Sequence, residues 1–231
     1  MTRVGLVGAG PWATMFHAPM LAGASGLDLS VVWARRPEAA TALAEHFGAE
    51  AVGSFDELLE RCDAVAFAVP PDVQAALAVR AAEAGRHLLL EKPVATTLAD
   101  AERLAAAVDR AGVRSQVVLT IRYRPAVRAF LRGVVAETVT YVRGSCVGPG
   151  ALPGSPFATP WRQSSGAALL DVGPHTFDLL EAVAGPITEE LAHSIESGEP
   201  HPLDVHHGVR LQRVLEAAAR SVGTGHPVLL P

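Results

Sequence analysis

The chain has 231 residues, of which 49% are hydrophobic and only 5% aromatic, and its formal net charge is -5. This length suits one large or two small domains, and the apolar content excludes a disordered chain. The arginines are scattered rather than clustered, and no apolar run reaches the roughly 18 residues of a membrane span. We therefore expect no nucleic-acid partner and no membrane partner, and in the absence of a signal-peptide pattern we expect a cytoplasmic protein.

Short apolar runs alternate with helical periods over the first half of the chain. This alternation is typical of βαβ units around a parallel sheet, so the predicted fold class is α/β. The predicted strands are Arg3–Val7, Leu29–Ala34, a short one near Ala51, Ala64–Val69, His87–Glu91 and Ser115–Thr120. The predicted helices between them are Pro11–Ala22, Pro37–Phe47, Phe55–Glu60, Asp72–Ala84 and Leu98–Arg110.

The alternation weakens after Thr120. The pattern there predicts a basic helix, one strand, a loop rich in Gly and Pro, and three further helices. In chain order these are Pro125–Leu131, the strand Thr138–Ser145, the loop through Trp161, Pro174–Val183, Glu189–Glu196 and Val205–Ser221. We therefore divide the chain into residues 1–121 and a second, smaller α+β domain over residues 122–231.

The first predicted strand leads directly into a glycine-rich turn. Gly8-Ala9-Gly10-Pro11-Trp12-Ala13 has the form G-x-G-x-x-A and opens a helix. In this context Gly8 supplies the tight turn, Gly10 lets the backbone approach a pyrophosphate, and Ala13 keeps helix and strand close. The turn predicts a Rossmann dinucleotide-binding domain over residues 1–121, with the pyrophosphate at the N-terminus of the helix.

The residues at the end of the second predicted strand indicate whether the protein prefers NAD(H) or NADP(H). Sites that prefer NAD usually carry an acidic residue there, which bonds to the ribose 2′-hydroxyl. This chain instead has Arg35 and Arg36, whose guanidinium groups suit a 2′-phosphate. We therefore favour NADP(H), with NAD(H) as the alternative.

Lys92 directly follows the fifth predicted strand. The carboxyl ends of the strands point to the ligand crevice of an open α/β sheet, so this position predicts a functional side chain. An ammonium group there polarises a hydroxyl or carbonyl oxygen and relays its proton.

Several motifs in a fixed order resemble those of the Gfo/Idh/MocA oxidoreductases. They are the Gly8–Ala13 turn, His17-Ala18-Pro19, Ala68-Val69-Pro70-Pro71, Ala84-Gly85-Arg86-His87, Glu91-Lys92-Pro93 and Asp171-Val172-Gly173-Pro174-His175. The resemblance implies an NAD(P)-dependent oxidoreductase with Lys92 as a catalytic residue and a cis bond between Lys92 and Pro93. It also implies that Pro11, Trp12, Val69, Pro70 and Glu91 lie at the cofactor.

His175 and Asp171 belong to the last of these motifs, and the resemblance implies that both act in catalysis. An imidazole exchanges protons near neutral pH, so we assign His175 as the general acid or base. Asp171 would orient the imidazole or bind a substrate hydroxyl. Because proline disrupts a helix interior, we expect the helix to begin near Gly173, with Asp171 just before it.

A further set of side chains lies in stretches that approach the cleft in the family. We take Arg122, Trp161 and Arg162 as substrate-binding candidates, and Arg162 suits a polar substrate group. Asp178 follows His175 by three residues and would either pair with it or face solvent. The histidines of the last forty residues match no ligand spacing, so no metal site is expected.

The region after Gly185 contains fewer predicted strands than the resemblance implies. Two interpretations follow: an enzyme that transfers a hydride between nicotinamide and a small polyol, sugar or carbonyl compound, or a non-catalytic protein that binds NADP(H). The retained Lys92 and His175 favour the enzyme. A third alternative is a cofactor-assisted elimination or hydrolysis that returns the hydride to the substrate. The strand Thr138–Ser145 has few predicted partners, which predicts a homodimer.

Overall fold

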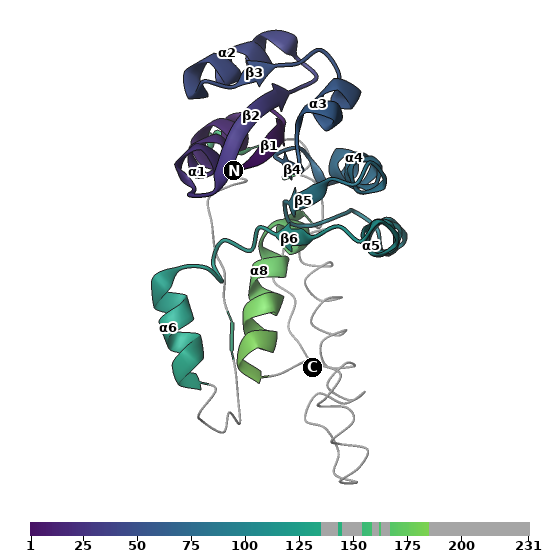
Figure 1. Ribbon diagram of the computed structural model, residues 1–231. Coiled ribbons are helices and arrows are strands. Elements are labelled where there is room, and N and C mark those ends of the chain that lie inside the picture. Colours follow the sequence, from purple (N-terminus) through teal and green to yellow (C-terminus); the bar gives the residue numbers. More distant parts are fainter. Residues whose placement is uncertain (135–142, 145–153, 159–161, 163–166, 185–231) are drawn as a thin grey trace, which may run out of the picture.

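The computed structural model describes residues 1–134, 143–144, 154–158, 162 and 167–184 (Figure 1). Six parallel strands form one sheet in the order β3-β2-β1-β4-β5-β6. This is the order of a Rossmann fold, in which ligands bind where the strand order reverses. The strands are β1 (Thr2–Val7), β2 (Leu27–Trp33), β3 (Glu50–Ala51), β4 (Ala64–Phe67), β5 (His87–Leu90) and β6 (Ser115–Val117). The predicted α/β class is confirmed.

Helices cover both faces of this sheet. They are η1 (Ala13–His17), α1 (Ala18–Gly23), α2 (Pro37–Phe47), α3 (Phe55–Arg61), α4 (Pro71–Glu83) and α5 (Leu98–Ala111), followed by α6 (Pro125–Val134) and α8 (Ala167–Ala184). One apolar cluster joins the sheet to α3, α4 and α5, and it includes the fully buried Phe67. A second cluster joins the other face to η1, α1 and α2 around Leu6 and Val32. The two clusters hold the sheet rigid, so the loops at its carboxyl edge are fixed in place.

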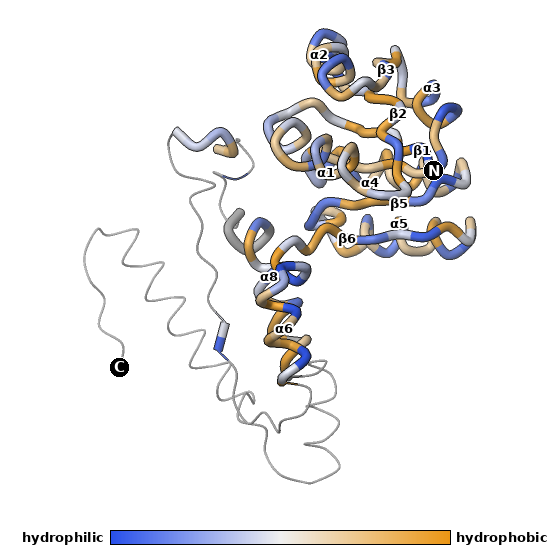
Figure 2. The backbone as a smooth tube through the Cα atoms, turned by 60° about the vertical axis from the view of Figure 1, so that its left-hand side comes forward, coloured by the Kyte–Doolittle hydropathy of each residue, from blue (hydrophilic) through white to orange (hydrophobic). Residues whose placement is uncertain are grey.

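Local sequence signals explain where the helices begin. Ser54 precedes α3 and accepts a hydrogen bond from the backbone N–H of Glu57, while Thr97 does the same for Asp100 at the start of α5. Such caps satisfy N–H groups that have no partner inside a helix. Figure 2 shows hydrophilic and hydrophobic residues alternating along α5, as expected of a helix with one face on the core.

The predicted strands overran the observed ones at their carboxyl ends. The strand expected to reach Val69 ends at Phe67, and the one expected to reach Thr120 ends at Val117. The reason is that the apolar run continues into the loop. The backbone N–H of Ala68 still bonds to the carbonyl of Val7 on β1, but Ala68, Val69 and Pro70 also line a cavity at this end of the sheet. Ala68, Val69 and Pro70 are therefore part of the wall of the candidate site.

Helix α8 begins earlier than predicted. It runs from Ala167 with Pro174 in its interior, so Asp171 lies within the helix and not before it. An interior proline removes one backbone hydrogen bond and costs about 3 kcal/mol. Here Lys92 donates to the backbone carbonyl of Asp171, and Lys92 and Arg162 both bond to its carboxylate. These contacts favour the helical position of Asp171 in spite of the proline.

The rest of the second region is described only in part. Helix α6 packs against α8, and none of its side chains is buried among the described residues. The predicted strand Thr138–Ser145 lies almost wholly outside the described residues, and the predicted helices Glu189–Glu196 and Val205–Ser221 lie entirely outside them. In the described part of the chain no helix is long and apolar enough to cross a membrane.

Candidate active site

A cavity of about 380 Å³ lies at the carboxyl edge of the sheet, between the loops that follow β1, β2 and β4. Gly8 and Gly10 line it from the first loop, Arg35 and Arg36 from the second, and Val69 and Pro70 from the third, among other residues. Both the glycine turn and the two arginines predicted to bind the cofactor therefore line this cavity.

The three small residues of the turn differ in what surrounds them. A Cβ on Gly8 would lie 2.5 Å from the carbonyl oxygen of Ala68, and the φ of Gly8 is +112°, so only glycine fits. A Cβ on Gly10 would meet no atom within 4 Å. Ala13 is fully buried against the sheet. Gly8 and Ala13 thus serve close packing, whereas the space at Gly10 lies open to the cavity.

A second cavity of about 160 Å³ continues from the first, since both are lined by Gly10, Ala68, Val69 and Pro70. Pro11, Trp12, Glu91, Lys92 and Arg162 line this second part, together with Phe157. The structure therefore brings Lys92 and the glycine turn to one continuous cleft. The bond between Lys92 and Pro93 is cis, as the resemblance implies.

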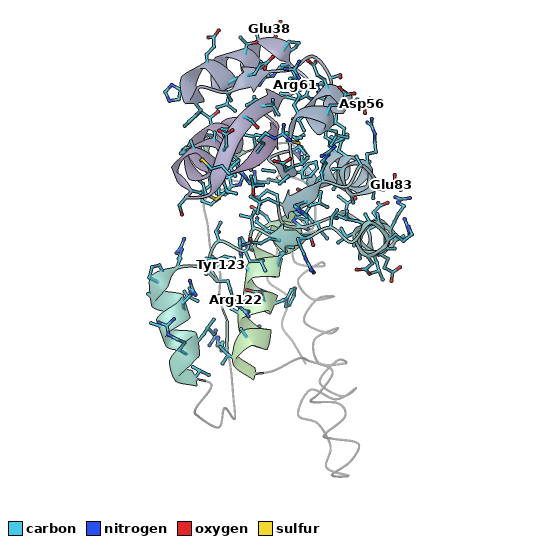
Figure 3. All side chains as sticks on the ribbon, in the orientation of Figure 1. Glu38, Asp56, Arg61, Glu83, Arg122 and Tyr123 are labelled. Carbon is cyan, nitrogen blue, oxygen red and sulfur yellow. The ribbon has the colours of Figure 1, made fainter. Side chains whose placement is uncertain are left out.

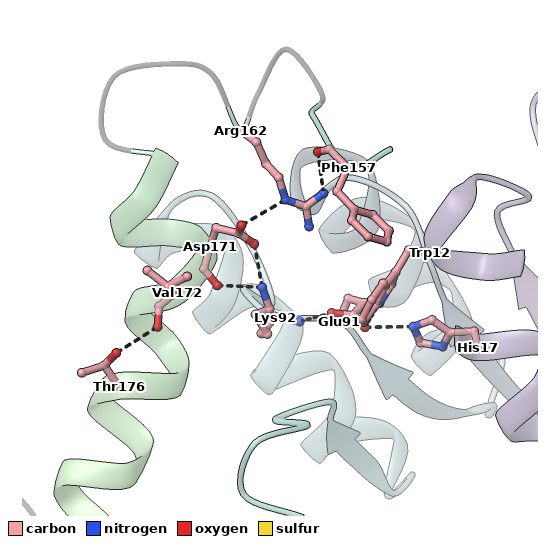
Figure 4. A network of polar contacts seen from close by, with 9 residues as sticks. All are labelled: Trp12, His17, Glu91, Lys92, Phe157, Arg162, Asp171, Val172 and Thr176. Carbon is pink, nitrogen blue, oxygen red and sulfur yellow. Dashed lines mark hydrogen bonds and ion pairs between the residues drawn. The ribbon is translucent and has the colours of Figure 1, made fainter. Parts of the chain in front are cut away.

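Lys92, Asp171 and Arg162 form a chain of ion pairs at this end of the cleft (Figure 4). The Nζ of Lys92 lies 2.8 Å from one carboxylate oxygen of Asp171 and 2.7 Å from its backbone carbonyl oxygen. The other carboxylate oxygen accepts a hydrogen bond of 3.1 Å from the Nε of Arg162. The Nη1 of the same guanidinium donates to the backbone carbonyl of Phe157. One carboxylate thus orients two cations that line the cleft.

Electrostatics keeps Asp171 charged. Burial alone would raise its pKa, but the hydrogen bonds and charges of Lys92 and Arg162 outweigh burial and lower the pKa below its ordinary value. A lowered carboxylate pKa means that the ion pairs persist at neutral pH and are lost only as the pH falls through that pKa. Lys92 therefore keeps its partner throughout the neutral range.

His175 lies one helical turn beyond Asp171 and is 8% exposed. Burial and then the charge of Lys92 lower its pKa below the ordinary value, although Glu91, Asp171 and Asp178 act in the opposite direction. The imidazole is therefore neutral at neutral pH, which is the form that accepts a proton. His175 is close enough to Lys92 and Glu91 for their charges to act on it, but it is not among the described residues that line either cavity.

The remaining substrate candidates are placed differently. The guanidinium of Arg122 lies 2.9 Å from a carboxylate oxygen of Asp178, so this carboxylate pairs with Arg122 and not with His175. Figure 3 shows Arg122 beside α8. Arg122 is not among the described residues that line the cavity beside Lys92. Arg162 lines the cleft as predicted, whereas Trp161 lies outside the described residues.

Gln74 and His17 are two polar residues at the site to which sequence reasoning assigned no role. The side chain of Gln74, on α4, is fully buried and bonds to both the N–H and the carbonyl of Glu91, each at 2.8 Å. The side chain of His17 is also fully buried and lies 2.9 Å from the carboxylate of Glu91. For Gln74 the signal was a polar residue inside an otherwise apolar helix, and for His17 it was a place in one of the motifs of the resemblance. Neither signal indicated Glu91 as the partner.

The described residues contain no cluster of side chains of the kind that binds a metal ion. Among those residues no group of three or more His, Cys, Asp or Glu side chains lies together as ligands would. Cys62 is buried with its thiol against Gly5, where a small apolar side chain fits. Cys146 and the histidines after residue 185 lie outside the described residues.

Comparison with known sequences agrees with the Rossmann fold described above. Residues 2–119 match the family GFO_IDH_MocA, described as an oxidoreductase family with an NAD-binding Rossmann fold. The chain is similar to the dTDP-3,4-didehydro-2,6-dideoxy-alpha-D-glucose 3-reductase of Streptomyces violaceoruber, with 33% identity over 189 residues. These residues are 79% of this chain and 54% of that protein.

Solved structures of oxidoreductases crystallised with nicotinamide cofactors are also similar to this chain. KijD10, a 3-ketoreductase from Actinomadura kijaniata crystallised with NADP, matches with a TM-score of 0.55 and 30% identity over 60% of this chain and 45% of that one. GenD2 from gentamicin A biosynthesis, crystallised with NAD, matches with a TM-score of 0.66 and 26% identity over 80% and 54%. The chain spans about half the length of these relatives.

Proposed function

Because the chain belongs to the Gfo/Idh/MocA family of oxidoreductases, we propose that it transfers a hydride between NADP(H) and a small polyol, sugar or carbonyl substrate. The observation that carries this proposal is the continuous cleft, which runs from Arg35 and Arg36 across Gly10 to Lys92. A pure nucleotide-binding protein has no need of a lysine that is held at the far end of the cleft by Asp171.

The described residues fit a dinucleotide cofactor. The cleft lies at the reversal of the strand order, and the space beside Gly10 is one that a side chain would fill. Gly8, Gly10 and Pro11 would hold the pyrophosphate, Arg35 and Arg36 the 2′-phosphate, and Val69, Pro70 and Trp12 would line the rest. When bound, the cofactor supplies or accepts the hydride.

The chain's own groups would manage the proton and the charge on the substrate oxygen. When an alcohol is oxidised, its C–H hydrogen leaves as a hydride and its O–H proton passes to the neutral imidazole of His175. The ammonium of Lys92 donates a hydrogen bond to the same oxygen and stabilises the negative charge that develops on it. Asp171 holds Lys92 in place, and Arg162 would bind a second polar group of the substrate. Reduction of a carbonyl compound reverses these steps.

The names of the relatives support a sugar as the substrate. The Streptomyces violaceoruber protein is a 3-reductase of a dTDP-linked keto sugar, and KijD10 is a 3-ketoreductase. The cavity beside Lys92 has a volume of about 160 Å³ and is lined by both polar and aromatic side chains. We therefore place keto sugars and polyols first among the candidate substrates.

Absorbance at 340 nm tests the proposed reaction. Purified protein with NADPH and a panel of keto sugars should lose absorbance, and protein with NADP⁺ and polyols should gain it. NADPH that binds, as shown by calorimetry, without any change of absorbance or of substrate would support the non-catalytic alternative. Substrate that is converted without a change of absorbance, as shown by NMR, would support elimination or hydrolysis with return of the hydride.

Replacement of both arginines by glutamate, in Arg35→Glu/Arg36→Glu, is expected to reverse the cofactor preference. Each charge-assisted hydrogen bond to the 2′-phosphate contributes about 1.5–3 kcal/mol, so removal of each one should weaken binding of NADPH by about tenfold or more. Binding of NADH should not weaken to the same extent. Arg110→Glu, at an exposed position of α5, is the matched control and should leave both dissociation constants unchanged. Equally tight binding of NADH and NADPH by the parent protein would contradict the assignment.

Two further predictions from the sequence belong to this proposal. The first is a homodimer, which was inferred from the few partners of the predicted strand Thr138–Ser145. The second is a domain boundary after residue 121, with a smaller domain over residues 122–231. Both stay predictions.

A further inference from the structure

We propose that His17, which is buried away from the cleft, is a positioning residue that acts through Glu91 to hold Trp12 at the Lys92 end of the cleft. For its kinetic consequences this inference rests on the proposed hydride transfer. Its structural part concerns only three side chains of the protein and is testable without substrate.

The carboxylate of Glu91 is the centre of the arrangement, and it accepts three hydrogen bonds (Figure 4). One oxygen accepts from the indole N–H of Trp12 at 2.6 Å and lies 2.9 Å from the Nε2 of His17. The other oxygen accepts from the backbone N–H of Lys92 at 3.1 Å. A buried carboxylate requires such partners, and here they connect the glycine-turn helix with the residue at the end of β5.

The helix is wound so that Trp12 and His17 reach the same oxygen. Residues five apart in an α-helix lie about 140° apart around the axis. Over Ala13–His17 the helix is instead a π-helix, and the N–H of Ala18 bonds to the carbonyl of Ala13, five residues earlier. This winding brings residues five apart to the same side. The local distortion thus has a chemical consequence, because it gives one carboxylate two donors from the same helix.

The bonding of His17 indicates which of its nitrogens carries the proton. Its Nδ1 is buried and has no hydrogen-bond partner among the described residues, whereas its Nε2 faces Glu91. An N–H at Nδ1 would be left without an acceptor, which costs more than a lone pair without a donor in this position. The proton therefore belongs on Nε2, and His17 donates to Glu91.

The backbone of Glu91 is fixed independently of its side chain. Gln74 bonds to both the N–H and the carbonyl of Glu91, so the residue is clamped in position from the side of α4. His17 is then left with one task, to fix the orientation of the carboxylate. Trp12 depends on that orientation, because its indole donates to the same oxygen.

Trp12 is the member of the group that meets the cleft. It lines the cavity together with Lys92, stacks on Phe16 with ring centroids 4.8 Å apart, and makes an edge contact with Phe157 at 5.6 Å. His17 lines neither described cavity. A shift of the carboxylate would move the indole within the cleft, and misplacement by about 1 Å lowers turnover by as much as about a hundredfold.

The test is a double-mutant cycle between His17 and Trp12. His17→Leu removes the donor at similar size, and His17→Gln retains an amide N–H that reaches Glu91. We expect His17→Leu to lower kcat about tenfold or more, and we expect His17→Gln to restore most of the loss. In the Trp12→Phe background, His17→Leu should lower kcat no further. Additive losses in the cycle, or equal losses in the Leu and Gln variants, would overturn the proposal.

Tryptophan fluorescence of the protein alone provides a second readout. His17→Leu should change the emission of the parent but not that of Trp12→Phe, which retains Trp33 and Trp161. If His17→Leu does not fold, His17→Asn, whose shorter amide does not reach Glu91, takes its place in both cycles. A parent without hydride transfer contradicts the proposed function, while the fluorescence cycle still decides the role of His17. Unchanged emission in every His17 variant would refute it.

Discussion

Lys92→Ala and His175→Ala are each expected to lower turnover about a hundredfold or more, while the Kd of NADPH changes little. Lys92 lines the second cavity, whereas Arg35 and Arg36 line the first. Its loss would therefore remove the proposed hydrogen bond to the substrate oxygen and leave the proposed phosphate contacts in place. Steady-state kinetics and fluorescence titration with NADPH would separate the two effects.

Two controls distinguish chemistry from structure. Lys92→Arg keeps a cation beside Asp171 that can still donate a hydrogen bond to the substrate oxygen, so it should recover part of the turnover that Lys92→Ala loses. His46→Ala removes an exposed histidine at the end of α2 and should turn over like the parent. Normal turnover in His175→Ala would exclude its role as the acid or base.

Gly10→Val is expected to weaken NADPH binding about a hundredfold or more without changing the stability of the protein. The new side chain would meet no protein atom within 4 Å of its Cβ and would instead occupy the cleft where the pyrophosphate is expected. Gly8→Val should behave in the opposite way. Its Cβ would lie 2.5 Å from a backbone oxygen at a φ of +112°, so the fold should lose several kcal/mol.

Urea unfolding and calorimetric titration measure the two quantities separately. The comparison is sharp because the glycines are two residues apart and belong to the same turn. If Gly10→Val binds NADPH as the parent does, the cleft at this turn is not the cofactor site. If Gly8→Val is as stable as the parent, the close approach to Ala68 does not constrain the turn.

The sheet was predictable because each strand is an apolar run of the length that a buried parallel strand needs. The order of the runs, together with Gly8 and Gly10, was enough to identify a dinucleotide-binding fold. The ends of the strands were less certain. The apolar residues of Ala68–Pro70 lie past the end of β4 and line the cleft, and hydrophobicity alone does not distinguish them from strand residues.

The candidate site was predictable where a motif marks a residue and less so where contacts between distant segments decide. Asp171 and Lys92 were named, but the start of α8 was wrong because local propensity at Pro174 is overridden by contacts 79 residues away in the sequence. His17 and Glu91 are 74 residues apart in the sequence, and their contact depends on the π-helix Ala13–His17. No periodicity in the sequence predicts either contact.

The ammonium group of Lys92, which is paired with Asp171, can be labelled selectively. Lys92 is the only lysine among the 231 residues, so the cleft contains the one side-chain amine of the whole chain. Reductive methylation with ¹³C-formaldehyde would therefore place an NMR-visible group at Lys92 and, apart from it, only at the α-amine of the chain. Methylation keeps the positive charge. The chemical shift of that group would report directly on whether the ammonium is held by Asp171 or has been released to a bound ligand.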